Sequence, residues 1–230
     1  MNESMLATLG LGFVLGIKHA TEADHLAAVS TIVSQRRSIW QSAAVGVFWG
    51  IGHTAALVAA GVLVLGVGLV IPEKVANIFE LGVALMIIFL GMRLLHLHIH
   101  SHSHGGPSHI HFHFQDEQHA ECAHSGLAGW RSVIIGMIHG LAGSAALTLL
   151  VLSQVARTGG ALMGLAYLLI FGAGSVAGML VMSSLISLPF ALGLRFFQRS
   201  LVALRIVTGV LSTSFGIVYA WRIAEKLSMF

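Results

Sequence analysis

Six long apolar stretches, separated by more polar segments, dominate the sequence. Because lipid cannot hydrogen-bond to an exposed backbone, stretches of this kind cross a membrane as helices, and about 20 residues span a hydrocarbon core about 30 Å thick. Only 9% of the 230 residues are charged, against about 25% in ordinary soluble domains. The sequence therefore predicts an all-α, polytopic membrane protein with about six transmembrane helices, over residues 5–34, 42–71, 76–96, 130–154, 160–188 and 201–223.

A polar segment of residues 97–129 holds nine of the fourteen histidines and separates a first three-helix unit, residues 1–96, from a second, residues 130–230. The formal net charge is +3, and Lys and Arg gather at the ends of the stretches, as is typical of lipid contact and topology rather than nucleic-acid binding. By the positive-inside rule the histidine-rich loop is cytoplasmic and both termini lie outside the cell membrane. The cytoplasmic set is Arg36, Arg37, Arg93, Arg131, Arg195, Arg199 and Arg205, against Lys74, Arg157, Arg222 and Lys226 on the other side.

The two units resemble one another in sequence. Gly16–Ala20 aligns with Gly136–Gly140 at an offset of 120 residues, and Gly50–Thr54 aligns with Gly172–Val176 at an offset of 122. Since each unit has an odd number of spans, tandem copies enter the bilayer from opposite sides. We therefore expect two inverted three-helix repeats, an arrangement common in secondary transporters, with substrate bound near the membrane midplane.

Ionisable residues interrupt the first apolar stretch at His19, Glu22, Asp24 and His25. A charged side chain at the bilayer centre costs about 2.5–3.5 kcal/mol on insertion scales, so such residues indicate a functional site. Imidazole nitrogens and carboxylate oxygens suit a borderline divalent metal ion. In an unbroken helix Asp24 would lie about 140° from His19, so we predict a break between Lys18 and His25 that lets the side chains converge. The alternative is a buried polar turn in which Lys18 pairs with Glu22.

Two further histidines lie inside apolar stretches. His53 has glycines beside it that allow close backbone approach, and we interpret it as a metal ligand or as support for one. A lone buried histidine can also simply hydrogen-bond, to a carbonyl or to Thr54. His139 occupies the repeat position of His19 and is a weaker candidate ligand, because its neighbours Gly136 and Gly140 are also typical of a packed helix interface.

Alternating histidines fill the polar loop. Short histidine-rich tracts bind metal ions through their composition rather than at a fixed site, and neutral imidazole suits Ni, Co, Zn and Cu alike. We predict that the loop collects, buffers or senses metal ions; a linker without such a role is the alternative. The single cysteine, Cys122, excludes an internal disulfide and argues against a thiolate cage. The candidate loop ligands are His96, His98, His100, His102, His104, His109, His111 and His113.

His19, followed by four residues and then Asp24 and His25, is similar to the signature of the nickel/cobalt transporter superfamily, and Phe48–Thr54 resembles that family's following histidine helix. The resemblance covers about the first 95 residues. It implies a nickel or cobalt permease in which the signature residues and the histidine of the second motif handle the ion. The short, six-span form resembles the urease-accessory H-type branch. Glu22 stands where an aspartate is usual, and the efflux branch of the family also carries a histidine-rich loop.

These features together predict a carrier that takes up Ni²⁺, with Co²⁺ as a second substrate, by alternating access. The ion is transported, so neither catalysis nor a cofactor is expected. The expected partners are the metal ion, the lipid bilayer and cytoplasmic nickel chaperones or urease-type accessory proteins, but not nucleic acid. Because imidazole must be deprotonated to bind a metal ion, uptake should fail below about pH 6.5. Open alternatives are a nickel/cobalt efflux carrier, an intramembrane metalloenzyme with Glu22 as general base, and a loop-based metal sensor.

Overall fold

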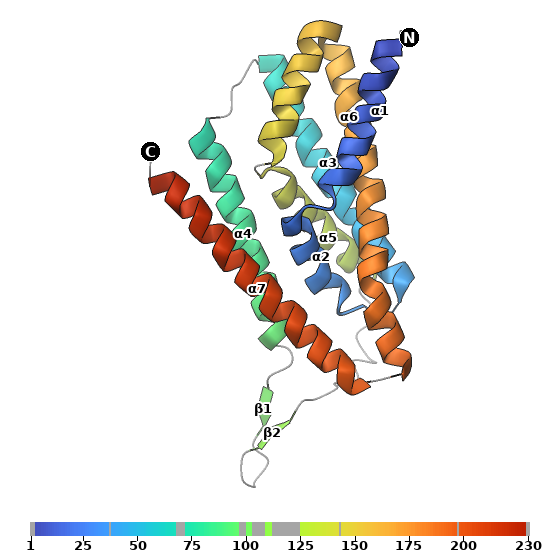
Figure 1. The fold of residues 1–230 in the computed structure, drawn as a ribbon, viewed down its shortest axis with the longest axis vertical. Coiled ribbons are helices and arrows are strands. Elements are labelled where there is room, and N and C mark those ends of the chain that lie inside the picture. Colours follow the sequence, from blue (N-terminus) through green and yellow to red (C-terminus); the bar gives the residue numbers. More distant parts are fainter. Residues whose placement is uncertain are drawn as a thin grey trace.

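Seven helices and one two-stranded ribbon make up the part of the chain that the computed structural model describes (Figure 1). The described residues are 3–36, 38–67, 72–96, 100–102, 109–111, 125–142, 144–196 and 198–228. The elements are α1 (Glu3–His19), α2 (Ala23–Val33), α3 (Ile39–Val67), α4 (Glu73–His96), β1 (His100–His102), β2 (His109–His111), α5 (Ser125–Gly140), α6 (Ser144–Phe196) and α7 (Gln198–Ser228).

The first apolar stretch is broken where the sequence predicts. Helix α1 ends at His19 and α2 begins at Ala23, with Glu22 in an extended conformation (φ −66°, ψ 149°). The turn satisfies its own backbone, since the Thr21 N–H donates to the Lys18 carbonyl at 2.9 Å and the Glu22 N–H donates to the His19 carbonyl at 3.0 Å. A helix can be interrupted at membrane depth only when the freed backbone groups find partners in this way.

The helices of the second unit differ in their bounds from the spans that the sequence predicts there. The stretch predicted over 130–154 is not one helix, because α5 ends at Gly140 and α6 begins only at Ser144. Helix α6 is itself divided at Gly160, whose φ of 81° lies in the left-handed region that glycine tolerates. Helix α5 begins at Ser125, five residues before the predicted boundary at 130. Each unit therefore starts with an interrupted apolar stretch.

Four helical segments in the described residues are long and apolar enough to cross a membrane: Ile39–Gly66, Glu73–His96, Gly159–Leu192 and Leu201–Ser228. Two shorter apolar segments, Met5–His19 and Ala23–Val33, are the two sides of the break. Large apolar side chains are exposed along the outer faces of these helices, as lipid contact requires. The protein is a multi-pass membrane protein.

The helices pack in two groups, with α2 between them (Figure 1). Helix α1 packs along α6, α5 along α3, and α3 against α6, whereas α4 pairs with α7. Glycines allow the close approaches within the first group. A side chain at Gly16 would overlap the carbonyl oxygen of Phe171, and one at Gly136 would overlap that of Trp49. Such backbone contact through small residues is characteristic of helix association in membranes.

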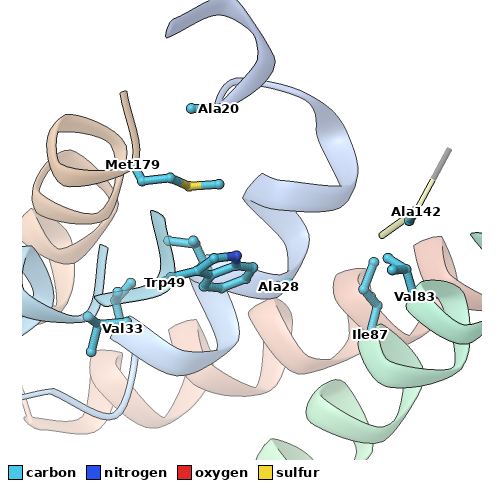
Figure 2. Packing of buried hydrophobic residues seen from close by; sticks show 10 residues of the cluster. Ala20, Ala28, Val33, Trp49, Val83, Ile87, Ala142 and Met179 are labelled. Carbon is cyan, nitrogen blue, oxygen red and sulfur yellow. The ribbon is translucent and has the colours of Figure 1, made fainter. Parts of the chain in front are cut away.

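A buried apolar cluster surrounds the break in the first helix (Figure 2). Ala20 lies in the turn itself, and Ala28 lies in the second turn of α2. Three larger side chains approach from α3, α4 and α6: Trp49, Val83 and Met179. The interior is packed closely, so displacing one element disturbs its neighbours. This packing fixes where the polar side chains of the broken helix lie.

Candidate metal centre

Four imidazoles and one carboxylate meet at the broken helix. In each of two overlapping sets, one potential ligand atom from every residue lies within 4.8 Å of the others. The histidine triad consists of His19, His25 and His53, and the aspartate triad consists of Asp24, His25 and His139. All four histidines are buried, and the Asp24 side chain is 16% exposed. The sets draw on α1, α2, α3 and α5, so the centre exists only in the folded helix assembly.

The histidine triad has the dimensions of a metal site. Its ring centroids lie 4.5 Å (His19 to His25), 4.9 Å (His19 to His53) and 5.3 Å (His25 to His53) apart. The Nε2 atoms of His19 and His53 are 3.1 Å apart. Nitrogens that each bind an ion at about 2.0–2.1 Å lie about 3–3.5 Å from one another. The two imidazoles are therefore already spaced as adjacent ligands would be.

Carboxylates form hydrogen bonds with two of these rings at Nδ1. The Nδ1 of His19 lies 3.0 Å from Oε2 of Glu22, and the Nδ1 of His25 lies 3.0 Å from Oδ1 of Asp24. When the Nδ1–H group of an imidazole donates a hydrogen bond to a carboxylate, Nε2 carries the lone pair that binds a metal ion. The His25 backbone N–H also donates to Asp24 Oδ1, at 2.9 Å, which fixes the carboxylate.

Asp24 joins the two triads. Its second oxygen, Oδ2, accepts from His139 Nε2 at 2.9 Å, so one carboxylate orients an imidazole of α2 and one of α5. The rings of His25 and His139 lie close together, with centroids 4.1 Å apart. Asp24 can therefore act either as a direct oxygen ligand or as the group that aligns both rings.

Three imidazole nitrogens in the centre are buried and have no hydrogen-bond partner within the described part of the chain: His25 Nε2, His53 Nδ1 and His139 Nδ1. Buried polar atoms are nearly always satisfied, because an unpaired one costs about 1–3 kcal/mol. An orphaned Nε2 on His25, in a triad with His19 and His53, is the pattern expected of a site that binds an ion. The donor set, nitrogen with some oxygen and no sulfur, suits Ni²⁺, Co²⁺ or Zn²⁺.

The structure brings together five of the six residues that the sequence singled out inside the apolar stretches, and it places Glu22 beside them. Glu22 contacts the centre only through His19, and its side chain is 44% exposed. His53 lies against His19 rather than being held by Thr54, whose hydroxyl donates to the Gly172 carbonyl at 3.3 Å. His139 is completely buried and faces Asp24 and the Trp49 ring.

The loop histidines form no part of either triad. His96 is exposed at the end of α4. Strands β1 and β2 pair antiparallel, which sets His100 opposite His111 and His102 opposite His109. The predicted ligands His98, His104 and His113 lie outside the described residues.

Two aromatic residues and a serine near the centre were missed at the sequence level. The Trp49 ring lies 5.6 Å from His139 and the Phe171 ring 5.6 Å from His19, and these aromatic residues are 122 positions apart, the repeat offset. Ser175, which the same offset pairs with His53, is buried, and its hydroxyl oxygen has no hydrogen-bond partner among the residues that the structure describes. The internal alignment could have found all three.

The fold and the site define a class: a multi-pass helical membrane protein with a buried histidine and carboxylate centre at a broken helix. The chain belongs to the family described as "Cytochrome C biogenesis protein transmembrane region", which matches residues 26–218. No solved structure matches the chain.

Relatives of this chain carry names that concern nickel or urease. It is 42% identical over 226 residues to the urease accessory protein UreH of Bacillus sp. (strain TB-90), covering 98% of this chain and 96% of that protein. It is 31% identical over 83 residues to the high-affinity nickel transport protein of Cupriavidus necator, covering 34% of this chain and 22% of that protein. It is 37% identical over 68 residues to the hydrogenase nickel incorporation protein HupN of Bradyrhizobium diazoefficiens, covering 27% of this chain and 17% of that protein. These relatives support the nickel/cobalt transporter-type family that the motifs predicted.

Proposed function

We propose that this protein transports Ni²⁺, and Co²⁺ as a second substrate, across the cytoplasmic membrane into the cell. The observation that carries the proposal is the pair of overlapping triads, which share His25 and lie at a helix break inside a multi-pass membrane protein. The printed names of the relatives, a nickel transport protein and a nickel incorporation protein, agree with nickel as the cargo. All three relatives are named as transport, incorporation or accessory proteins, and we propose no catalysis.

In this proposal the ion binds first to the histidine triad. The Nε2 atoms of His19, His25 and His53 serve as ligands. Glu22 accepts a hydrogen bond from the Nδ1–H group of His19, and Asp24 accepts one from that of His25. Carboxylates in this position raise the basicity of the ligand and fix its orientation. His139 and an oxygen of Asp24 offer a neighbouring position on the other side of His25. An ion could thus pass between the two triads by changing two ligands while keeping His25.

Reciprocal glycine contacts support a six-span architecture of two inverted repeats, in which each interrupted stretch counts as one crossing. Gly52 approaches the backbone of Val133, and Gly174 approaches that of Phe13. The internal alignment converts one contact into the other. An offset of 122 residues relates the two glycines, and an offset of 120 residues relates their partners, Phe13 and Val133. The contacts of Gly16 and Gly136 described above exchange in the same way. A two-fold axis in the membrane plane would produce this reciprocity.

The centre also lies between the two packing groups, which suggests how access could alternate. His19, His53 and His139 belong to α1, α3 and α5, which pack with α6. Asp24 and His25 belong to α2, which packs mainly against α4 and α7. Two hydrogen bonds tie α2 to α7: Ser212 donates to the Ala27 carbonyl at 3.0 Å and Arg205 Nε donates to the Ser34 carbonyl at 2.9 Å. Movement of one group against the other would therefore separate the ligands and release the ion.

The 42% identity to UreH over nearly the whole of both chains supports the urease-accessory H-type branch. We accordingly propose that the histidine-rich loop is cytoplasmic, that it buffers the imported ion, and that it passes the ion to nickel chaperones or urease-type accessory proteins. The cross-strand histidine pairs of β1 and β2 provide neighbouring imidazole-bearing positions for that role.

The experiment that tests the function is accumulation of ⁶³Ni²⁺ in cells producing the wild type or the His25→Ala variant, with Co²⁺, Zn²⁺ and Mn²⁺ as competitors. We expect accumulation above the empty-vector control, its loss in the variant, and strongest competition by Co²⁺. Accumulation below the control would identify an efflux carrier. No change in either direction, with both proteins present in the membrane, would reject transport and favour the sensor or the metalloenzyme.

A further inference from the structure

We propose that Trp49 is a positioning residue of the metal centre. Its indole N–H group holds one buried water molecule against His139, and this water fixes which nitrogen of the His139 ring carries the proton. The inference rests on the proposed function, because it concerns how the ion ligand His25 is supported. Trp49 touches no ion and acts only through His139 and Asp24.

Trp49 lies on α3 one turn before His53, a member of the histidine triad. The Trp49 ring is completely buried in the apolar cluster (Figure 2), and its centroid lies 5.6 Å from that of His139, at an interplanar angle of 54°. A side chain at Gly136, about one turn before His139 on α5, would lie 2.9 Å from Cδ1 of Trp49. Since Cδ1 is bonded to Nε1, the polar edge of the indole faces α5.

Two nitrogens of these neighbouring rings are buried and have no hydrogen-bond partner among the described residues: Trp49 Nε1 and His139 Nδ1. An indole nitrogen can only donate. His139 Nε2 lies 2.9 Å from Asp24 Oδ2, and an ionised carboxylate can only accept, so the His139 proton is on Nε2 and Nδ1 carries a lone pair. An unsatisfied donor and an unsatisfied acceptor therefore belong to two rings in contact.

A water molecule satisfies both groups, because it accepts from one and donates to the other at the same time. Two hydrogen bonds in series span up to about 6 Å between nitrogens, and the two ring centroids are 5.6 Å apart. Buried waters typically lie where protein polar groups would otherwise lack partners. A metal ion does not fit between these rings, since the indole nitrogen of Trp49 offers no lone pair and its N–H dipole repels a cation.

The water completes a chain of hydrogen bonds that ends at a metal ligand. Trp49 donates to the water, the water donates to His139 Nδ1, and His139 Nε2 donates to Asp24 Oδ2 at 2.9 Å. The other oxygen of Asp24, Oδ1, accepts from His25 Nδ1 at 3.0 Å and from the His25 backbone N–H at 2.9 Å. This leaves the lone pair of His25 Nε2 for the ion. Trp49 thus helps to orient a ligand that it does not contact.

The aromatic residue at the repeat-related position supports a polar role for Trp49. Phe171, 122 positions later, packs on His19 with the same centroid distance of 5.6 Å. Both ring nitrogens of His19 already have partners, Glu22 Oε2 at 3.0 Å and His53 Nε2 at 3.1 Å, and Phe171 has no polar side-chain atom. The aromatic side chain with an N–H group therefore packs on the histidine whose Nδ1 lacks a partner in the described part of the chain. A space-filling role for Trp49 would not explain this difference.

The first test needs no metal ion. In purified protein labelled with ¹⁵N in tryptophan and histidine, the indole N–H signal that disappears in Trp49→Phe belongs to Trp49, and the ring signals that disappear in His139→Gln belong to His139. We expect the Trp49 N–H to transfer magnetisation to a long-lived water molecule, and the His139 ring to be protonated at Nε2. No such water signal, or a His139 ring protonated at Nδ1, would overturn the inference.

The second test measures the affinity of purified protein for Ni²⁺ by calorimetric titration. We expect Trp49→Phe to weaken binding about three- to tenfold, less than the loss of about 10- to 100-fold expected when a direct partner of a ligand is removed. Trp221→Phe is the matched control and should bind as the wild type. Trp221 is 69% exposed, and its Nε1 donates to Glu225 Oε1 at 2.9 Å, so this variant also loses an indole hydrogen bond.

Two further proteins separate the N–H group from the packing of the ring. In the first, benzothienylalanine replaces Trp49 by site-specific incorporation; it keeps the size and shape of the indole but carries sulfur in place of the N–H group. It should weaken Ni²⁺ binding as Trp49→Phe does. In the second, Trp49→Phe is combined with His139→Gln and should bind no more weakly than His139→Gln alone, because the chain is already broken.

Wild-type affinity in the benzothienylalanine protein, or additive losses in the double variant, would overturn the inference and leave Trp49 as a packing residue. If Trp49→Phe does not fold, the benzothienylalanine protein identifies the Trp49 signal and supplies the affinity comparison. Failure of the wild type to accumulate Ni²⁺ above the vector control would instead reject the proposed function. The metal-free NMR measurement is independent of that result.

Discussion

His19 and His53 face one another inside the membrane-spanning assembly, with their Nε2 atoms 3.1 Å apart. Without an ion, this contact is a hydrogen bond in which one ring donates and the other accepts. With an ion, both Nε2 atoms can present lone pairs to the metal once the proton of the donating ring has moved to its Nδ1, and their spacing already fits adjacent ligands. Ion binding would thus replace this hydrogen bond with two metal–ligand bonds.

His53→Gln should abolish tight Ni²⁺ binding by the purified protein. The variant removes one nitrogen of the histidine triad and leaves the carboxylate contacts of His19 and His25 in place. Calorimetric titration with Ni²⁺ checks this result, and Ser184→Ala provides the control, since the Ser184 hydroxyl only donates to the Leu180 carbonyl of its own helix. Unchanged affinity in His53→Gln would remove this residue from the ligand set.

Asp24→Asn should weaken Ni²⁺ binding more than Glu22→Gln. Asp24 is largely buried and accepts from two imidazoles, whereas Glu22 is 44% exposed and contacts only His19. Loss of a group that orients metal ligands costs about 10- to 100-fold in affinity, and we expect Asp24→Asn to fall in or above this range and Glu22→Gln below it. The same titration measures both variants, and equal effects, or the reverse order, would contradict the assigned roles.

Gly136→Ala should destabilise the protein, because a methyl group there would overlap the carbonyl oxygen of Trp49 and push α5 away from α3. Gly82→Ala is the matched control: its methyl group would meet no atom within 4 Å, and alanine favours a helix over glycine by about 0.5–1 kcal/mol. Thermal unfolding in detergent, followed by fluorescence, should show a lower midpoint for the first variant and an equal or higher one for the second. An unfolding midpoint of Gly136→Ala at or above that of the wild type would contradict this prediction, because α5 could then move away from α3 without loss of stability.

The sequence predicted which polar side chains gather at the broken helix better than it predicted the helices around them. The spacing of His19, Asp24 and His25 was readable because charges in an apolar stretch stand out, and their angular positions on a helix required a break. The interruption after Gly140 was missed, since Leu141 and Ala142 are apolar and carry no such signal. Periodicity alone cannot distinguish a continuous apolar helix from one that stops and restarts.

The contact between Asp24 and His139 lies beyond what local patterns encode. The two residues are 115 positions apart, and they meet because glycines let α5 approach α3 closely. The internal repeat identified His139 as a candidate only by analogy with His19. Its actual partner is a carboxylate of the other unit, which depends on how the units pack and not on the sequence of either one.

Replacing residues 98–124 with a glycine and serine linker of equal length separates the carrier from the sensor. Such a linker is flexible and binds no metal ion, while both triads lie outside the replaced segment. If the loop only buffers the ion, ⁶³Ni²⁺ uptake at saturating nickel should keep most of its rate, and the number of Ni²⁺ ions bound per purified protein should fall. If the loop is the working part of a sensor, the variant should lose its entire nickel-dependent effect although the central site still binds Ni²⁺. Initial uptake rates and the stoichiometry of binding, measured on the same variant, distinguish the two, since a carrier retains transport after losing the loop sites and a sensor does not.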